Sequence, residues 1–554
     1  MKGALAIAFV FVLSALPLNT AENVFFSMPF SNGYSSAIYD TKEKAVTAFT
    51  DMIEWYWSPA KERKNMLHRA YLGLKFGNRT TWLNELEPES TEYLNESGIV
   101  HVSYKQADCY YFAPFVGGKH TIAFVCDSNA DAVLLHAELL DPGVRITKRI
   151  EGNRTTIVLS LEPVDGISLE NEIEFWDDFH SVEPQVSEEY EKLFRQSTAF
   201  LKMGQSAESG AILAGLIPGR WTIAWVRDCC YSIKALIDSN HLSEAKKALE
   251  FLLNGEAGSF KHFNYNGKDY GIGEDYLISV CRYFGDGSEW SDDIDQQESE
   301  PVENMEDPNI ELDGFGLFLW VADEYVKKSG DKEFLEENMD KLKLVGENIL
   351  HSIDENNLIR EDSSIWERHL SRARHYLYTS ITCAKGLESL CEMCSSEGIS
   401  EFEEGYARLR KGISDSVDEE GVLKGNIEEE KYYDAAVIEA INFGLVNESV
   451  AESTMSALER ELFNGKGFKR NDDGDWYDEQ EWIFIDLRAA EAYLKLGERE
   501  KAMALIDRIN SISAENFNII AELYDENENY AGQVPMCGYG AGVFVSAVLA
   551  SAQI

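Results

Sequence analysis

The N-terminal third of the chain alternates apolar and polar residues in short runs, with the period of two that is typical of β-strands. Turn signals separate these runs, as Asp141, Pro142 and Gly143 do. The clearest runs cover residues 100–104, 121–125, 132–136, 145–150 and 155–161. Short strands at this spacing predict an antiparallel β-sandwich, which we place at residues 22–180.

Beyond residue 185 the apolar positions recur every three or four residues, and this helical period continues towards the C-terminus. One example runs from Ser243, a candidate N-cap, to Gly255, which is expected to end the helix. About a dozen helices follow one another, joined in pairs by tight turns. We expect a linker helix within residues 181–204 and a helical domain over residues 205–554.

Repeated helical hairpins form either an open solenoid or a closed ring, and their period alone does not distinguish the two. The segments between hairpins are long, aromatic and acidic at residues 264–275, 284–308, 471–482 and 516–535. Loops of such length in a compact domain are usually functional. This favours a closed barrel whose loops gather around a pocket. The expected fold class is therefore mainly α, with an N-terminal β domain.

At 554 residues, of which 44% are hydrophobic, the chain is long enough for two domains. It carries 97 acidic and 50 basic residues, which give a formal net charge of −47. That charge repels phosphate backbones and anionic lipids, so it argues against nucleic-acid binding. A neutral partner such as a carbohydrate substrate is not repelled.

Residues 1–21 have the composition of a secretory signal peptide. Lys2 precedes an apolar stretch, and the polar residues Asn19 and Thr20 end it. We therefore expect a secreted or cell-surface protein, with an uncleaved N-terminal anchor, a misassigned start and a cytoplasmic location as the alternatives. No later segment of the sequence resembles a membrane span.

The nine cysteines are sparse and odd in number, which does not fit a disulfide framework. Cys391 and Cys394 form a C-x-x-C pair, but it lies in a helical pattern without a second pair or a histidine beside it. We interpret the cysteines mainly as core thiols.

Two glutamates far apart in the sequence each stand close to an aromatic residue. Glu367 follows Trp366, and Glu522 lies two residues before Tyr524. Inverting cleavage of a glycosidic bond needs a carboxylic acid that protonates the leaving oxygen and a carboxylate that activates water, roughly 6.5–9.5 Å apart. Two glutamates from distant loops, flanked by aromatic rings, meet that need.

Trp225, Arg227 and Asp228 form a third candidate segment, at the start of a predicted helix. An arginine fork, a carboxylate and an indole face suit a sugar ring, which presents hydroxyl groups and an apolar side. The alternative is a structural ion pair between Arg227 and Asp228, because carboxylates are common at helix N-termini.

Taken in order, these segments resemble glycoside hydrolase family 15, the glucoamylase-like enzymes. The matching segments are 225–228 for the substrate-binding W-x-R-D motif, 282–287 for a loop of archaeal and bacterial members, 311–320 for the Q-x-D-x-x-G-x-x-L helix, 365–367 for the W-E motif, 475–482 for the late tryptophan loop and 521–525 for the E-Q-Y/F motif. The similarity covers about residues 190–554, and the N-terminal β region resembles the accessory domain of prokaryotic members.

The resemblance implies an (α/α)6 barrel and exo-acting, inverting hydrolysis of α-glucosides without a metal or an organic cofactor. It implies that Glu367 is the general acid and Glu522 the general base. Their surroundings must then separate their two pKa values, and we expect burial against Trp366 to raise that of Glu367. The substrate-binding residues that it implies are Trp225, Arg227, Asp228, Trp366, Arg368, Trp482 and Tyr524.

The chain departs from the family pattern at several positions near these motifs. Leu523 stands where glutamine is usual, Tyr539 lies in a Gly-Tyr-Gly stretch where many members have W-S or W-A, and His369 follows Arg368 after the acid. These departures leave the preferred linkage and chain length open.

The leading hypothesis is a glucoamylase-like enzyme that releases glucose from the non-reducing ends of α-glucans. A trehalase of the same family is the nearest alternative, because the motifs bind the glucose unit that both substrates share. A non-catalytic glucan-binding or regulatory module is the alternative of another class. The presence of both Glu367 and Glu522 argues against it.

Overall fold

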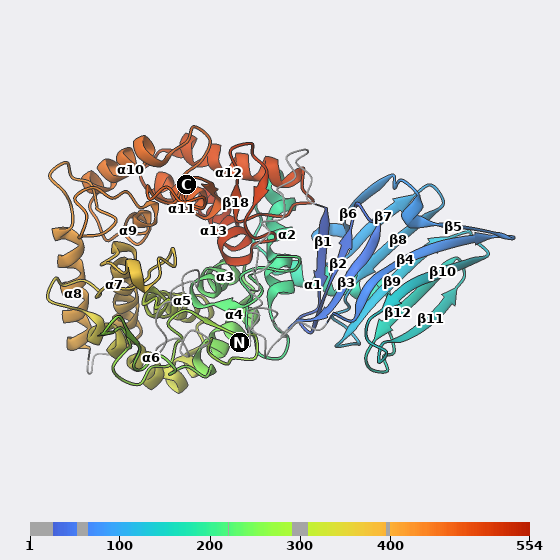
Figure 1. Cartoon of the computed structure of the whole chain (residues 1–554), viewed down its shortest axis with the longest axis horizontal. Helices are drawn as coiled ribbons and strands as arrows, with labels where there is room; N and C mark the ends of the chain where they lie inside the picture. The colour runs from blue at the N-terminus through green and yellow to red at the C-terminus, as the bar shows by residue number, and fades with distance from the viewer. Residues whose placement is uncertain (1–25, 53–64, 220, 291–308, 395–398, 554) are drawn as a thin grey trace, which may run out of the picture.

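The computed structural model describes residues 26–52, 65–219, 221–290, 309–394 and 399–553. A β-sandwich comes first in the chain, and a ring of helices follows it (Figure 1). The expected signal peptide lies outside the described residues. No helix in the described part of the chain combines the length and apolar character that crossing a membrane requires.

Two antiparallel sheets form the sandwich. The first contains, in spatial order, β1 (Ser27–Ser31), β2 (Ser35–Asp40), β3 (Ala45–Asp51), β4 (Leu67–Phe76) and β10 (Ala132–Leu139), with β5 (Arg79–Trp82) paired to β4. The second contains β11 (Arg145–Glu151), β12 (Arg154–Ser160), β9 (Thr121–Ser128), β8 (Ala107–Phe112), β7 (Val100–Tyr104) and β6 (Ser90–Tyr93). Two short 3₁₀ turns, η1 (Leu83–Glu85) and η2 (Leu94–Glu96), flank β6.

The alternation seen in the sequence is the alternation between the two faces of these sheets. In β7, Val100, Val102 and Tyr104 are buried while the residues between them are half-buried. Tyr39 of the first sheet stacks on Tyr111 of the second, with ring centroids 4.8 Å apart. All five runs predicted from the sequence are strands, so the predicted sandwich is confirmed.

Six helix pairs form the ring, which is an (α/α)6 barrel (Figure 1). The inner helices are α3 (Val226–Asp238), α5 (Asp313–Ser329), α7 (Leu377–Met393), α9 (Glu439–Asn442), α11 (Ile483–Lys495) and α13 (Val543–Ala552). The outer helices are α4 (Leu242–Asn254), α6 (Lys332–Ser352), α8 (Ser400–Asp415), α10 (Glu448–Leu462), α12 (Arg499–Ala514) and α2 (Glu188–Gly204). Each inner helix contacts the next, and α13 returns to α3, so the ring is closed.

Burial explains why the two layers differ in sequence. α5 is apolar on almost every side and is buried from Asp313 to Asp323, as an inner helix must be. α12 buries only one stripe, which includes Leu505, Ile506 and Ile509. A single apolar stripe therefore marks an outer helix.

Two local predictions need correction. The helix expected to link the domains, α2, packs against α12 and α13 and is the outer member of the sixth pair. Ser243 does not cap α4, which begins one residue earlier at Leu242. His241 is the N-cap residue instead, and its ring contacts the buried carboxylate of Glu183 at 3.1 Å.

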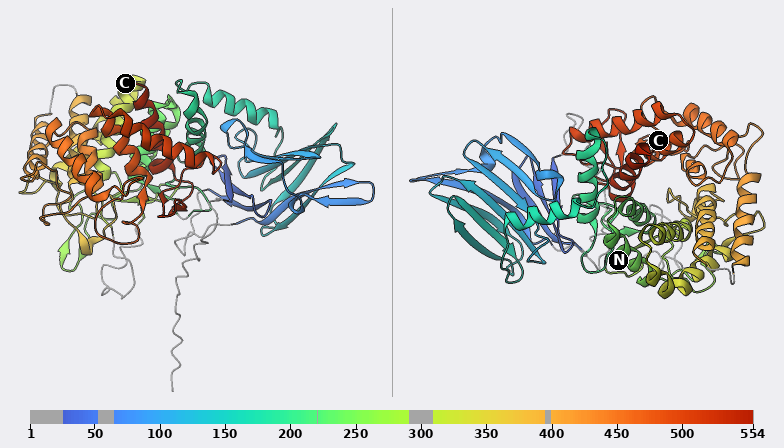
Figure 2. Two further views of the ribbon diagram at one scale, coloured as in Figure 1. Left: turned by 90° about the horizontal axis from the view of Figure 1, so that it is seen from above. Right: turned by 180° about the vertical axis from the view of Figure 1, so that it is seen from behind.

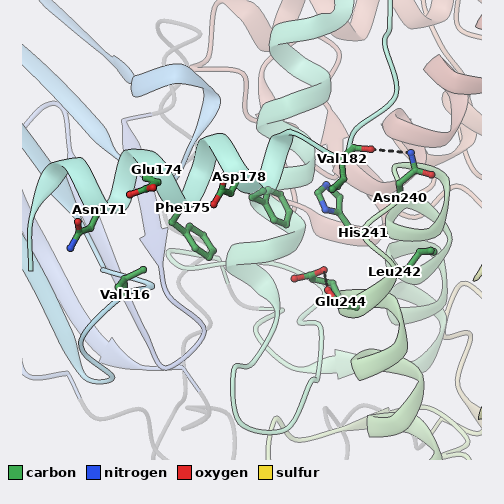
Figure 3. A pocket seen from close by; sticks show the side chains of 12 residues that line it. Val116, Asn171, Glu174, Phe175, Asp178, Val182, Asn240, His241, Leu242 and Glu244 are labelled. Atoms are coloured by element: carbon green, nitrogen blue, oxygen red, sulfur yellow. Dashed lines mark hydrogen bonds between the residues drawn. The ribbon is translucent and has the colours of Figure 1, made fainter.

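The helix α1 (Leu169–His180) lies where the sandwich meets the barrel (Figure 2). A hollow of about 700 Å³ lies between α1 and the start of α4, and Figure 3 shows Phe175 on one side of it and Asn240 on the other. Asn240 Nδ2 donates a hydrogen bond to the carbonyl of Val182 (3.0 Å). None of the residues that line this hollow belongs to the sequence motifs.

Short strands and turns join the loops that precede the inner helices. The strands are β13 (Ala224–Trp225) with β16 (Arg282–Tyr283), β14 (Asn264–Tyr265) with β15 (Lys268–Asp269), and β17 (Glu481–Trp482) with β18 (Leu523–Tyr524) and β19 (Tyr530–Ala531). The short helical turns are the 3₁₀ helices η4 (Leu370–Arg372) and η5 (Ala435–Ile438) and the π-helix η6 (Cys537–Gly542). All nine cysteines are free thiols, and seven of them are buried.

Candidate active site

A pocket of about 810 Å³ lies at the end of the barrel where the inner helices begin. Its lining comes from loops that are far apart in the sequence. The lining includes Trp221, Trp225, Arg227, Asp228, Arg282, Trp290, Asn309, Trp366, Glu367, Arg368, His369, Arg470, Trp476, Trp482, Glu522 and Tyr539. Such a volume suits a small molecule or a short oligosaccharide.

Glu367 and Glu522 reach this pocket from opposite sides of the ring. Glu367 stands in the loop before α7, the third inner helix, and Glu522 in the loop before α13, the sixth. In a closed ring of six helix pairs the third and sixth positions face each other. The barrel therefore brings two distant carboxyl groups to the two sides of one pocket.

The loop that carries Glu367 has an unusual backbone. Ser364, Glu367 and His369 have φ values of 50°, 49° and 56°, in the left-handed region that residues with a Cβ rarely adopt. Backbone hydrogen bonds hold the loop, from the N–H of Arg368 to the carbonyl of Ser363 and from Glu367 to Ser364. Strain of this kind is concentrated at functional sites, where surrounding contacts maintain it.

Three nitrogen donors surround the carboxyl group of Glu367. Asn309 Nδ2 and Arg282 Nη1 donate hydrogen bonds to Oε2, at 3.0 and 3.2 Å. Arg227 Nη2 lies 3.7 Å from Oε1. The side chain keeps 32% of its surface exposed, so it is open to a ligand in the pocket.

Glu522 has the opposite surroundings. It is only 7% exposed, and burial raises the pKa of its carboxyl to about 7. The N–H of Gln533 donates to Oε2 at 2.8 Å, and this bond and the charge of Arg470 oppose the rise in pKa. Our expectation had burial raising the pKa of Glu367, whereas the buried carboxyl of the pair is Glu522.

Arg227 and Asp228 do not pair with each other. Arg227 donates instead to Glu311 and, at 3.5 Å, to Asp313, because neighbours in a helix point in different directions. Within the described part of the chain, Oδ1 of the buried Asp228 has no hydrogen-bond partner. Burial raises the pKa of Asp228 to about 7, although the charge of Arg227 opposes the rise. A buried acceptor that faces a pocket without a partner suits a ligand hydroxyl.

Aromatic rings form one wall of the pocket. Trp366 meets Trp482 edge to face with ring centroids 4.9 Å apart, and the guanidinium of Arg470 lies over both rings. Trp366 Nε1 donates to Asp434 at 2.8 Å, and Trp482 Nε1 to the carbonyl of Tyr477 at 2.8 Å. These bonds fix both indoles in the wall of the pocket.

Arg368, expected to bind substrate, is 5% exposed and surrounded by acids. It contacts Asp473, and its guanidinium lies 3.4 Å from Asp475 and 3.5 Å from Asp478. Arg368 lines the pocket and also fastens the 473–478 loop beside Glu367.

No family model matches the chain. In sequence it is similar to Trehalase 1 of Sulfolobus acidocaldarius, with 24% identity over 325 residues, 57% of this chain and 54% of the relative. It is also similar to a trehalase of Thermoplasma volcanium, with 22% identity over 387 residues, 66% of this chain and 57% of the relative. The chain spans about half the length of the curated relatives it matches.

In structure the chain is similar to a bacterial glucoamylase complexed with acarbose, with a TM-score of 0.59 and 11% identity over 96% of this chain and 94% of that one. A wild-type glycosidase matches 70% of this chain and 98% of its own, with a TM-score of 0.51 and 17% identity. At these identities the two solved structures show that the chain shares its fold with a glucoamylase and a glycosidase.

One residue of the predicted site lies elsewhere. Tyr524 is fully buried and does not line the pocket. It stacks on Tyr530 with ring centroids 5.6 Å apart, and Arg508 of α12 lies over its ring. Tyr524 pairs with Glu481 across β17 and β18, and this pairing turns its ring towards the outer layer. The other six predicted substrate-binding residues line the pocket with Glu367 and Glu522.

Sequence reasoning missed Asn309, Arg282 and Arg470 as site residues, although all three line the pocket. Two of them could have been found from their position in the sequence relative to the inner helices. Asn309 lies just before an inner helix, as Trp225 and Trp482 do, and Arg282 is the strand partner of Trp225. Residues that immediately precede inner helices, and their strand partners, are the places to search in this fold.

Cys281, Glu311 and Glu367 place possible metal ligands within 4.8 Å of one another. Two guanidinium groups already bond this cluster, Arg227 to Glu311 and Arg282 to Glu367. Their positive charges repel a cation, so the donor set does not fit a metal site.

Proposed function

We propose that the protein is an exo-acting, inverting hydrolase of short α-glucosides, with Glu367 as general acid and Glu522 as general base. One observation carries this proposal: Glu367 and Glu522 come from opposite sides of the ring and line one pocket. Inversion requires such an arrangement, because water must attack the sugar ring from the face opposite the leaving group.

In the proposed reaction the glucose unit occupies the inner end of the pocket, and Asp228 accepts a hydrogen bond from one of its hydroxyls. Glu367 protonates the glycosidic oxygen as that bond breaks. Glu522 removes a proton from the water that attacks the anomeric carbon. The positive charge that develops on the ring is stabilised by the carboxylate of Asp228, which the pocket holds in place before the substrate binds.

The reaction requires an ionised Glu522 and a protonated Glu367. Glu522 must be ionised to act as a base, and its pKa of about 7 makes it a stronger base than an ordinary glutamate carboxylate. Glu367 must gain a proton although Arg282 and Asn309 donate hydrogen bonds to it. A sugar hydroxyl that enters the pocket competes with Glu367 for these donors.

Trehalose is the first substrate to test, because the sequence relatives named above are trehalases. Short malto-oligosaccharides are the second, because the likeness to a glucoamylase extends over 96% of the chain. The pocket volume of about 810 Å³ agrees with a short substrate in both cases. Export of the protein stays a prediction from residues 1–21.

α-Glucosyl fluoride tests the two roles separately, because fluoride leaves without protonation and needs no general acid. We expect Glu367→Gln to retain much more activity on this substrate than on trehalose or maltose. Glu522→Gln is expected to lose activity on all three, since each needs an activated water. If α-glucosyl fluoride restored activity to Glu522→Gln but not to Glu367→Gln, Glu522 would be the acid and Glu367 the base. If it restored activity to neither variant, the acid–base pair would be refuted.

A further inference from the structure

β11 is the last strand of the second sheet of the sandwich, at the lower right of Figure 1. All seven of its residues are exposed, and among the strands that the structure describes only β12 pairs with it. Ile146 and Ile150 keep 49% and 61% of their surface exposed. An unpaired strand edge with apolar side chains is a template for pairing with another chain.

The sequence of β11 complements itself when it runs antiparallel to a second copy. A two-fold axis through Lys148 sets residues opposite each other whose numbers are equally distant from 148. The resulting cross-strand pairs are Arg145 with Glu151, Ile146 with Ile150, and Thr147 with Arg149. Each pair occurs twice, so the edge gains two oppositely charged pairs and two apolar pairs.

We propose that β11 pairs with β11 of a second copy of this chain, in this register, to form a two-fold symmetric dimer. The second sheet then continues from one sandwich into the other. Along β11 only every second residue points its N–H and C=O groups towards the free edge. A register shifted by one residue would set such a residue opposite one whose N–H and C=O groups point towards β12, so the backbone hydrogen bonds could not form. The register centred on Lys148 pairs all seven residues.

Two lysines at the axis would repel each other, but Lys148 is already engaged. Its Nζ donates to the carbonyl of Val133 on β10 of the same sandwich, at 2.6 Å. The charge is therefore held between the two sheets of its own copy. Arg149 is engaged as well, since it donates to the carbonyl of Ile167 at 3.1 Å. Glu151 Oε1 lies 3.5 Å from Arg149 Nε of its own strand, so in the dimer its carboxylate meets Arg149 and also Arg145 of the second copy. Charge reversal at Arg145 or Glu151 therefore tests the pairing.

Sedimentation velocity of the full chain over a micromolar concentration series tests the proposal. We expect a monomer–dimer equilibrium for the wild type. Arg145→Glu and Glu151→Arg each replace two attractive pairs by two repulsive ones, so each should raise the dimer Kd by roughly tenfold or more. The double variant restores opposite charges across the axis, so its Kd should return to within about threefold of the wild type.

Arg79→Glu is the matched control, because it makes the same charge reversal on β5 of the other sheet. It should leave the Kd unchanged, and circular dichroism and glycoside hydrolysis should be unaltered in all four variants. A wild type that stays monomeric throughout the series overturns the proposal. A dimer that tolerates both single reversals, or that the double variant fails to restore, overturns it as well.

Discussion

Glu522→Gln should stabilise the protein at alkaline pH while it abolishes hydrolysis. Burial raises the pKa of Glu522 from the ordinary 4.5 to about 7. Between these values the folded protein keeps a proton that the unfolded chain releases, so the free energy of unfolding falls as the pH rises. The loss is complete above about pH 7. Glutamine has a similar shape but does not ionise, so the variant escapes this loss.

The size of the effect follows from the shift in pKa. One pKa unit corresponds to about 1.4 kcal/mol, so a rise from 4.5 to about 7 corresponds to roughly 3 kcal/mol. Glu522 is 7% exposed, so solvent screens this cost very little. We therefore expect the free energy of unfolding of Glu522→Gln to be roughly 3 kcal/mol higher than that of the wild type at pH 8 and equal to it near pH 4.

Urea unfolding, followed by tryptophan fluorescence at both pH values, measures this difference, because Trp366 and Trp482 line the same pocket. Glu515→Gln is the control, since it makes the same substitution at an exposed position at the end of α12, outside the pocket. Equal or lower stability of Glu522→Gln at pH 8 would refute the account of Glu522 as a buried base maintained for function.

Four further outcomes follow from the site. Glu367→Gln should lower kcat on trehalose or maltose by at least ~10²-fold without lowering Tm, and near-normal turnover would remove Glu367 from the mechanism. Asp228→Asn should lower both kcat and kcat/KM in steady-state assays, whereas a lowered Tm with unchanged kinetics would indicate a structural role. The kcat/KM of the wild type should fall at least tenfold per pH unit below about 7, where both Glu522 and Asp228 gain a proton, and a profile flat down to pH 5 would contradict this. Gly532→Ala should cost roughly tenfold or more in kcat, because Gly532 has a φ of 68° and an added Cβ would lie 2.3 Å from Glu522 Oε2, and unchanged kcat would show that the loop adapts.

Much of the fold follows from the sequence, because burial sets the period of apolar residues in strands and helices. The strand β7 and the helix α4, which ends before Gly255, are both predicted in this way. Closure of the ring was harder to predict, since it depends on α2 packing beside α13 near the other end of the chain. A local pattern cannot show such a contact, and α2 therefore resembled a simple linker.

The site was predictable where a residue belongs to a motif in a loop that precedes an inner helix, as Trp225 and Glu367 do. The contacts of a site residue were not predictable when its bonding partner lies in another part of the ring. Arg227 bonds to Glu311 rather than to its neighbour Asp228, and the pairing of β17 with β18 turns Tyr524 out of the pocket. The buried surroundings of Glu522 likewise depend on Gln533, which the sequence motif does not include.

The central claim is that Glu367 and Glu522 hydrolyse an α-glucoside with inversion. The most direct test is proton NMR of the freshly released glucose when purified protein is mixed with trehalose, maltose or maltotriose. The account predicts that maltotriose or maltose yields β-glucose first from its non-reducing end, and that trehalose yields equal amounts of α- and β-glucose, before mutarotation mixes the anomers. Only α-glucose at early times, or no glucose from any of the three, would contradict it.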